Sequence, residues 1–370
     1  MLPHPEAGTP SVRFSTLVDN EDNDDIFPFV RIEISGDNVA FTVVPTKPGA
    51  DGGVLFVFDW RAGRFKAERI PVSAEGVAFL RDDILINVNS KDSCIDVYFI
   101  PPITEASEGN ASLTMLKRFL LPPMHPTLTT TALDCLGSFH PLNRRSHSSA
   151  AEASFKPFTV HPSVSIIVFT FEVCSPEILA RQIQQFEDDE AVAKGYALSM
   201  VVHRHAFLAY LSALNPVNDL VPQSIVPGQL EIEWDVWGPN ATRWFTGTGL
   251  GCTPPCGQRC IDNPVGDSKK FEIDVYDFNL WNVKYAHSQV NNDTPSSVLV
   301  SVVIGSDPTH NQFSHPGIFP KDIHCRLPYV HRSIRAPQAH WCTHMTEDYL
   351  VNLVANNEFQ ELERVVLMKF

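Results

Sequence analysis

The chain has 370 residues and a net charge of −15 at pH 7, and 44% of its residues are hydrophobic and 19% charged. This balance is typical of a globular protein and argues against a disordered one. The sequence has no Lys- or Arg-rich stripe, which argues against nucleic acid as a partner, since neutralising phosphates requires basic clusters. Its longest apolar run, residues 164–171, is strand-sized and too short to cross a bilayer, so a membrane role is not expected.

Most apolar segments are short, rich in β-branched and aromatic residues, and bounded by Gly, Pro or polar turns, which predicts β-strands. In chain order the predicted strands are 38–44, 54–60, 84–88, 95–100, 113–120, 165–173, 198–203, 229–234, 271–278, 298–304, 349–354 and 364–368. With 29 prolines in the connections, this pattern predicts an all-β sandwich, barrel or propeller.

The distribution of apolar residues within these segments predicts how each strand is covered. Leu230, Ile232 and Trp234 recur at every second position, as expected of a strand with one buried face. Residues 164–171 are apolar almost throughout, which predicts a strand that is covered on both sides.

Helix signals are few. Ser175 followed by Pro176 is typical of a helix start, so residues 176–194 are predicted as a short helical or mobile insertion between strands. A further short helix is predicted at 205–214. No linker divides the chain, so a single domain is predicted at 29–370. The residues before it, 1–28, are predicted to form a flexible N-terminal segment.

The segment WDVWGPNATRWF, from Trp234 to Phe245, holds three of the six tryptophans around a Gly-Pro pair and a single arginine. Trp and Arg are the residues that dominate protein-binding hot spots, and Arg243 is able to offer its guanidinium to a partner's carboxylate. Alternatively, Arg243 stacks on Trp237 or pairs with Asp235 and braces a loop. The candidate residues for protein binding or loop bracing are Trp234, Trp237, Arg243 and Trp244.

Two Cys/His clusters are candidates for a metal site. Cys252, Cys256 and Cys260 are spaced by equal gaps of three residues, which differs from the tight knuckles of zinc sites. His340, Cys342 and His344 alternate, so on a strand all three would share one face. The favoured interpretation is that both clusters are free of metal, with reduced thiols and no cofactor.

Several motifs, taken in order from about Phe29 to Phe370, resemble elements of one protein family. They are VLFVFDWRAGRF at 54–65, YALSMVVHRHAFLAYL at 196–211, WDVWGPNATRWF at 234–245, VYDFN at 275–279, LPYVHRSI at 327–334 and the segment from 345 to 370. Together they resemble the C-terminal β-propeller-like region of the uncharacterised F-box proteins of mushroom-forming fungi (basidiomycetes). The resemblance implies an irregular, WD-repeat-like β-propeller of roughly six or seven blades, in which Trp60 packs across a blade and Gly63 makes its turn.

The family's F-box is not recognisable at the start of this chain. Leu2 and Pro3 match its first residues, but prolines and a glycine follow where an amphipathic helix is needed. The chain is therefore expected to be a paralogue that lost the module or a gene model that lacks its first exon. Either explanation argues against binding to a Skp-type adaptor by the sequence given.

The sequence contains no G-x-S-x-G, P-loop, G-x-G-x-x-G or H-E-x-x-H motif, so no enzymatic activity is predicted. The resemblance predicts a non-enzymatic protein-interaction module of the cytoplasm or nucleus, similar to the substrate-recognition part of a ubiquitin-ligase receptor, with an unknown protein partner. The alternatives are a metal-dependent enzyme that uses one of the two Cys/His clusters, and a vestigial structural paralogue.

Overall fold

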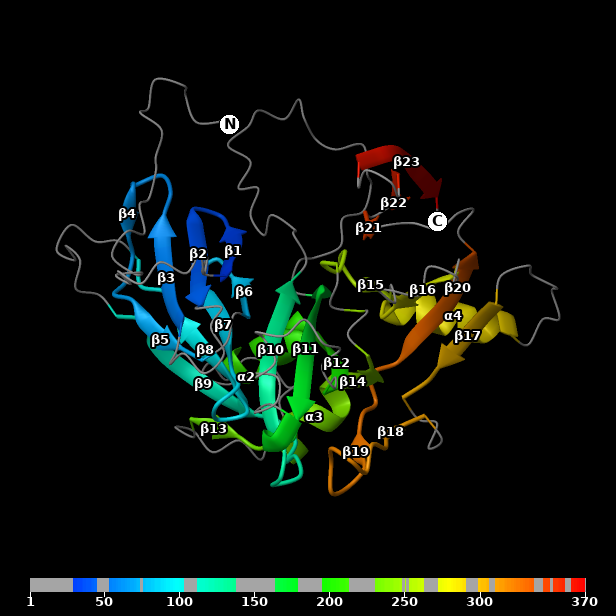
Figure 1. Ribbon diagram of the computed structural model, residues 1–370, viewed down its shortest axis with the longest axis horizontal. Coiled ribbons are helices and arrows are strands. Elements are labelled where there is room, and N and C mark those ends of the chain that lie inside the picture. The colour runs from blue at the N-terminus through cyan, green and yellow to red at the C-terminus, as the bar shows by residue number, and fades with distance from the viewer. Residues whose placement is uncertain are drawn as a thin grey trace.

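The computed structural model describes residues 29–44, 53–73, 76–102, 112–137, 164–178, 195–212, 230–247, 250, 253–262, 272–290, 299–305, 310–335, 342–346, 349–356 and 361–369 (Figure 1). The predicted N-terminal segment 1–28 and residues 179–194 of the predicted insertion lie outside these ranges, as do Cys252 and His340. No helix in the described ranges is long and apolar enough to cross a membrane.

Residues 29–120 build two sheets from consecutive antiparallel hairpins, and β13 is added to the second of them. The first has the order β1-β2-β3-β4, with β5 also paired to β3, and the second has the order β13-β9-β8-β7-β6. Their strands are β1 (Phe29–Ser35), β2 (Asn38–Val44), β3 (Gly53–Asp59), β4 (Arg64–Phe65), β5 (Ile70–Val72), β6 (Val77–Arg81), β7 (Ile84–Asn89), β8 (Cys94–Phe99), β9 (Thr114–Leu120) and β13 (Glu231–Ile232). β13 returns from a distant part of the chain and pairs with β9 in parallel.

The chain from residue 129 onward adds two four-stranded sheets, a three-stranded sheet and a short two-stranded one. The four-stranded sheets have the orders β10-β11-β12-β14 and β15-β16-β20-β17, and the smaller ones are β21-β22-β23 and β18-β19. The strands are β10 (Thr129–Gly137), β11 (Ile166–Cys174), β12 (Tyr196–His203), β14 (Thr242–Thr246), β15 (Arg259–Asp262), β16 (Glu272–Asp277), β17 (Leu299–Val303), β18 (Gln312–Phe313), β19 (Ile323–His324), β20 (Tyr329–Arg335), β21 (Cys342–Met345), β22 (Tyr349–Asn356) and β23 (Glu361–Lys369).

Helices α2 (Arg204–Ser212) and α3 (Trp234–Ala241) pack into the largest core, between the β6–β9 sheet and the β10–β14 sheet. This core includes Phe119 of β9, Phe169 of β11 and Phe207 of α2, whose rings meet edge to face. Helix α4 (Leu280–Val290) lies instead against β17 and β20. Asn279 accepts a hydrogen bond from the Trp281 N–H at the start of α4, as expected of a helix cap.

The strand predicted at 165–173 is confirmed as β11, and so is its burial on both faces. Ile167 and Phe169 point into the largest core, whereas Ile166 and Val168 belong to a separate core with Leu250 and Phe278. The predicted helix at 205–214 is confirmed by α2, and Ser175 accepts a hydrogen bond from the Ile178 N–H as its predicted cap role requires. The turn predicted at Gly63 is also confirmed, with a φ of 67° that favours glycine.

The prediction of a WD-repeat-like propeller with six or seven blades is wrong, although the chain is rich in β-structure. The first strands of three sheets, β1, β6 and β10, do lie side by side. However, the described strands form no closed ring, β13 joins a sheet whose other strands lie far earlier in the chain, and β17 and β20 are separated by the β18–β19 hairpin. Blades built from consecutive hairpins do not contain such crossings.

The strand predicted at 229–234 is largely wrong as well. Among its described residues, only Glu231 and Ile232 pair as a strand, and α3 begins at Trp234 and contains the Gly-Pro pair. Glu233 precedes the helix in an extended conformation, and the backbone N–H of Val236 donates to its carbonyl. The helix is stable here because Trp234 and Trp237 are buried on one side of it.

Gly238 should be required for this helix to form. A Cβ at Gly238 would overlap the indole ring of Trp234, whereas a Cβ at Gly317 would make only ordinary contact with Tyr196. We expect Gly238→Ala to lower the free energy of unfolding by about 1–3 kcal/mol through overpacking, and Gly317→Ala to change it by less than about 0.5 kcal/mol. Urea denaturation checks this, and equal effects of the two substitutions would contradict the packing described.

Candidate functional site

The four residues singled out in the sequence lie together, in and directly after α3. Trp234, Trp237, Arg243 and Trp244 are all at least nine-tenths buried. The indoles of Trp234 and Trp237 meet edge to face at 5.1 Å, and Trp234 and Trp244 do so at 6.0 Å. These side chains therefore face the core, and little of their surface is open to a protein partner.

Arg243 holds a neighbouring segment against β14. Its Nε donates to the carbonyl of Leu327 at 2.8 Å, and its Nη1 donates to the carbonyl of His310. The guanidinium also lies over the ring of Tyr329, 5.4 Å from the centroid. Its partners are thus not Trp237 and Asp235, the two that the sequence suggested.

Side-chain hydrogen bonds to backbone carbonyls fix the position of α3. The indole Nε1 of Trp237 donates to the carbonyl of Leu120 at the end of β9, at 2.9 Å. The hydroxyl of Tyr210 in α2 donates to the carbonyl of Val236, also at 2.9 Å. Both donors are largely buried, so breaking either hydrogen bond would leave a buried polar group without a partner, which costs free energy. Helix α3 is therefore held firmly over the end of β9.

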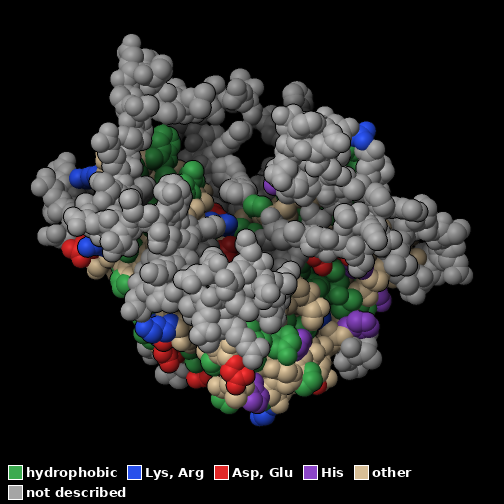
Figure 2. All heavy atoms as spheres, viewed as in Figure 1, with side chains coloured by type: hydrophobic (Ala, Val, Ile, Leu, Met, Phe, Trp, Pro, Cys, Tyr) green, Lys and Arg blue, Asp and Glu red, His purple; other side chains and the backbone are tan. Residues whose placement is uncertain are grey.

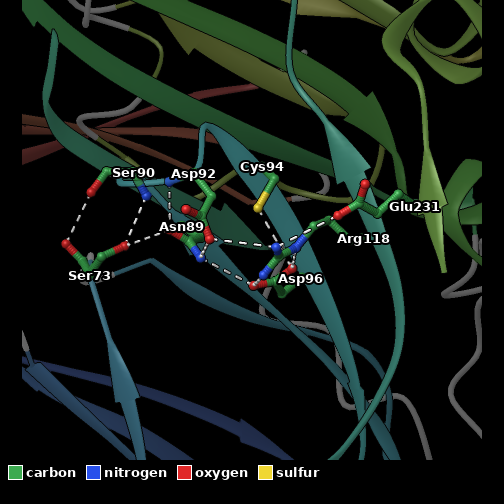
Figure 3. A network of polar contacts seen from close by, with 8 residues as sticks. All are labelled: Ser73, Asn89, Ser90, Asp92, Cys94, Asp96, Arg118 and Glu231. Atoms are coloured by element: carbon green, nitrogen blue, oxygen red, sulfur yellow. Dashed lines mark hydrogen bonds and ion pairs between the residues drawn. The ribbon is translucent and has the colours of Figure 1, made fainter.

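An arginine-centred network ties the strand before α3 to the same sheet (Figure 3). Arg118 of β9 binds both carboxylate oxygens of Asp96, at 2.7 and 3.1 Å, and its Nη1 lies 3.9 Å from Glu231. Its backbone N–H donates to the carbonyl of Leu230. The hydrogen bond to Asp96 raises the pKa of Arg118 above its usual value. Residues 230–233 are therefore fixed beside β9, directly before α3.

A cleft of about 670 Å³ opens between the end of β9, the start of α3 and the segment that contains β19. This volume lies within the range of small-molecule sites. The cleft is lined by Leu120, Leu121, Pro122, Pro123, Glu233, Trp234, Asp235, Pro239, Pro320, Lys321, Asp322, Ile323 and His324. Of the sequence-derived candidates, it includes Trp234 only.

Carboxylates predominate among the charged residues of the cleft. Glu233 and Asp235 come from the start of α3, and Asp322 comes from the opposite wall, next to Lys321. Glu233 occupies the N-cap position, yet its side chain makes no capping hydrogen bond, so its carboxylate is not committed to the helix. No local sequence pattern predicts this grouping of carboxylates, because its parts are about ninety residues apart and meet only through the fold.

The structure describes only parts of the two Cys/His clusters. Cys256 is half-buried and Cys260 is buried, and burial raises the pKa of the Cys260 thiol well above its usual value. His344 of β21 is exposed. Among the described residues, no group of three or more His, Cys, Asp or Glu side chains is arranged to hold a metal ion.

No protein-family model matches the sequence, and no curated protein matches it. The chain is similar to a solved structure from work on two prolyl endopeptidases, at 10% identity and a TM-score of 0.32, over 92% of this chain and 33% of that one. It is also similar to an acylaminoacyl peptidase of Pyrococcus horikoshii, at 8% identity and a TM-score of 0.20, over 92% of this chain and 51% of that one. The chain thus spans about a third to a half of these structures, and at these TM-scores no site or activity is transferred from them.

The functional prediction made from the sequence is wrong on this finding. It was a non-enzymatic protein-interaction module that recognises substrates for a ubiquitin ligase, whereas both similar structures are described as peptidases. Neither that role nor the exclusion of enzymatic activity is retained. Because no family model matches the chain, the resemblance to fungal F-box proteins is not tested and stays a prediction.

Arg243 should contribute strongly to stability. Replacing it with methionine leaves two carbonyl oxygens without their charged donor, so we expect Arg243→Met to lower the free energy of unfolding by about 3 kcal/mol. Arg81, which is exposed and pairs with Asp83, provides the control, and Arg81→Met should cost less than about 1 kcal/mol. Urea denaturation of both variants checks this, and a loss for Arg243→Met no larger than that of the control would contradict a bracing role.

Proposed function

We propose that the cleft beside α3 binds an organic cation, that is, a small ligand in which a protonated amine is joined to an apolar or aromatic group. The observation that carries this proposal is the combination of an apolar lining with three carboxylates around one cleft of about 670 Å³. The proposal concerns binding, and it leaves open whether a reaction follows.

The apolar part of the ligand has a defined place in the cleft. Leu121, Trp234 and Ile323 line it and are themselves packed in the largest core, so their exposed edges form a rigid surface. Pro122 and Pro320 add surfaces of little conformational freedom. Because such groups lose little entropy when a ligand binds, burial of an aromatic ring against them favours association.

The charged part of the ligand is selected by the carboxylates. Glu233, Asp235 and Asp322 outnumber the single cation Lys321, so the cleft has a negative surplus even though the start of α3 contributes a partial positive charge. The whole chain carries a charge of −15, which adds to the attraction of cations. An anion of the same size would instead meet three like charges.

The test uses a matched pair of ligands with the same aromatic ring, phenethylamine and 3-phenylpropionate. Isothermal titration calorimetry at low ionic strength should detect binding of the amine and none of the carboxylate. The double variant Glu233→Gln, Asp235→Asn should weaken amine binding roughly two- to tenfold, since each surface charge contributes a few tenths to about 1 kcal/mol. Added salt should weaken binding by the wild-type protein in the same direction.

The control for the loss of negative charge is Glu68→Gln, because Glu68 is exposed and does not line the cleft. This variant should bind phenethylamine as the wild-type protein does. The proposal would be overturned if the two ligands bound equally, or if the control weakened binding as much as the double variant.

A further inference from the structure

A serine, a histidine and an aspartate lie side by side on three adjacent strands of the β15-β16-β20-β17 sheet. They are Asp274 of β16, His331 of β20 and Ser301 of β17. The strand register places Ser301 opposite His331, and it places Asp274 opposite Ser333, two residues further along β20. Figure 2 shows histidine side chains at the surface on the right, the side on which Figure 1 places this sheet. We call Asp274, His331 and Ser301 the sheet triad.

Two hydrogen bonds join the sheet triad through the imidazole ring. Nε2 of His331 lies 2.9 Å from Oδ1 of Asp274, and Nδ1 lies 3.3 Å from Oγ of Ser301. A carboxylate only accepts hydrogen bonds, so Nε2 carries the proton of the neutral ring and Nδ1 accepts from the serine hydroxyl. A nucleophile, a base and a group that orients the base have this arrangement in covalent catalysis.

The imidazole of His331 is held in place by an aromatic neighbour. Tyr276 lies opposite it in the strand register, and the two rings stack with centroids 4.9 Å apart and planes 18° apart. Phe245 of β14 packs against the other side of the contact, edge to face with Tyr276 at 4.9 Å. Stacking fixes the plane of the imidazole, and the hydrogen bond to Asp274 fixes its rotation within that plane. The base is therefore positioned before any substrate arrives.

A second carboxylate lies behind the first. Asp262 of β15 is directly opposite Asp274 in the strand register. Burial and then the charge of Asp274 raise the pKa of Asp262 above its usual value, whereas His331 lowers it. A proton taken up by His331 creates a positive charge that attracts both carboxylates. This attraction favours the imidazolium form that a general base passes through.

The sheet triad is open to solvent. Ser301 is exposed, and the side chains of His331 and Asp274 are 23% and 35% exposed. In the described ranges, β17 is the edge strand of its sheet. Every second backbone N–H of an edge strand points away from the sheet, so one such donor lies within one residue of Ser301. A small molecule is thus able to reach Oγ and to place an oxygen near a backbone donor, which is where an oxyanion is stabilised.

We propose that the sheet triad hydrolyses carboxylic esters of phenols, with Ser301 as the nucleophile, His331 as the general base and Asp274 as the residue that positions the imidazole. Oγ forms a bond to the carbonyl carbon while its proton moves to Nδ1 of His331. The bond from the carbonyl carbon to the phenol oxygen then breaks, and the proton passes from Nδ1 to that oxygen. Water, deprotonated by the same Nδ1, attacks the acyl group, and the acid and the free serine are restored.

The surroundings of Ser301 select this class of ester. Asp262 and Asp274 repel an anionic substrate, so the ester is neutral or cationic. An open surface supplies little binding energy to lower a high barrier. The leaving group therefore has to be a good one, and a phenolate meets this requirement better than the amine of a peptide.

The test measures release of p-nitrophenolate from p-nitrophenyl acetate. Ser301→Ala should lower kcat/KM about tenfold or more, since it removes the nucleophile. The matched control is Ser288→Ala, which removes a serine that is exposed on α4 and donates to the carbonyl of Tyr285, and it should hydrolyse the ester as the wild-type protein does. p-Nitrophenyl phosphate should not be hydrolysed, and hydrolysis of the two compounds at equal rates would overturn the assignment to carboxylic esters.

Mass spectrometry identifies the acylated residue. Peptides from protein mixed briefly with p-nitrophenyl acetate should carry an acetyl group on Ser301, and Ser288→Ala should give the same result. An acetyl group found on lysines and not on Ser301 would overturn the proposal, as would hydrolysis by Ser301→Ala at the wild-type rate.

A variant of Asp274 separates positioning of the imidazole from a merely structural role. In Asp274→Asn the amide is able to donate to Nε2, which moves the ring proton to Nδ1 and leaves that atom unable to accept from Ser301. We expect kcat to fall about tenfold or more while KM stays unchanged, because Asp274 does not touch the ester. An unchanged kcat in a variant whose urea midpoint matches that of the wild-type protein would contradict the positioning role. These results are independent of the cleft beside α3, which contains no member of the sheet triad.

Discussion

The contact between the indole ring of Trp234 and the backbone at Gly238 is the constraint on which the arrangement around the cleft depends. The ring occupies the place where any other residue would carry its Cβ. This allows Trp234 to pack against its own helix, from which Trp237 donates to the carbonyl of Leu120. The helix then forms one wall of the cleft, and its last residues lead directly into β14, where Arg243 binds the segment that forms the opposite wall. A single tight contact therefore determines where two distant parts of the chain meet.

Much of the strand content could be predicted from the sequence, because strand signals are local. Alternation and apolar runs located β2, β3, β7, β8 and β11, and the double burial of β11 followed from its composition. Helix α4 was missed because it buries only a narrow stripe, at Val283 and Ala286, while Trp281 and Tyr285 are exposed. The segment 229–234 was predicted as a strand because its apolar residues alternate, but the burial of Trp234 together with Trp237 favours a helix. The cleft depends on tertiary contacts between distant segments, and these leave no local pattern in the sequence.

Binding of an organic cation beside Trp234 can be observed by fluorine NMR of the protein labelled with 5-fluorotryptophan. Trp60 and Trp281 are exposed and lie outside the cleft lining, so they report non-specific association. We expect titration with phenethylamine to shift the Trp234 resonance, assigned with Trp234→Phe, and to leave those of Trp60 and Trp281 in place. A titration in which the exposed tryptophans shift and Trp234 does not would contradict it.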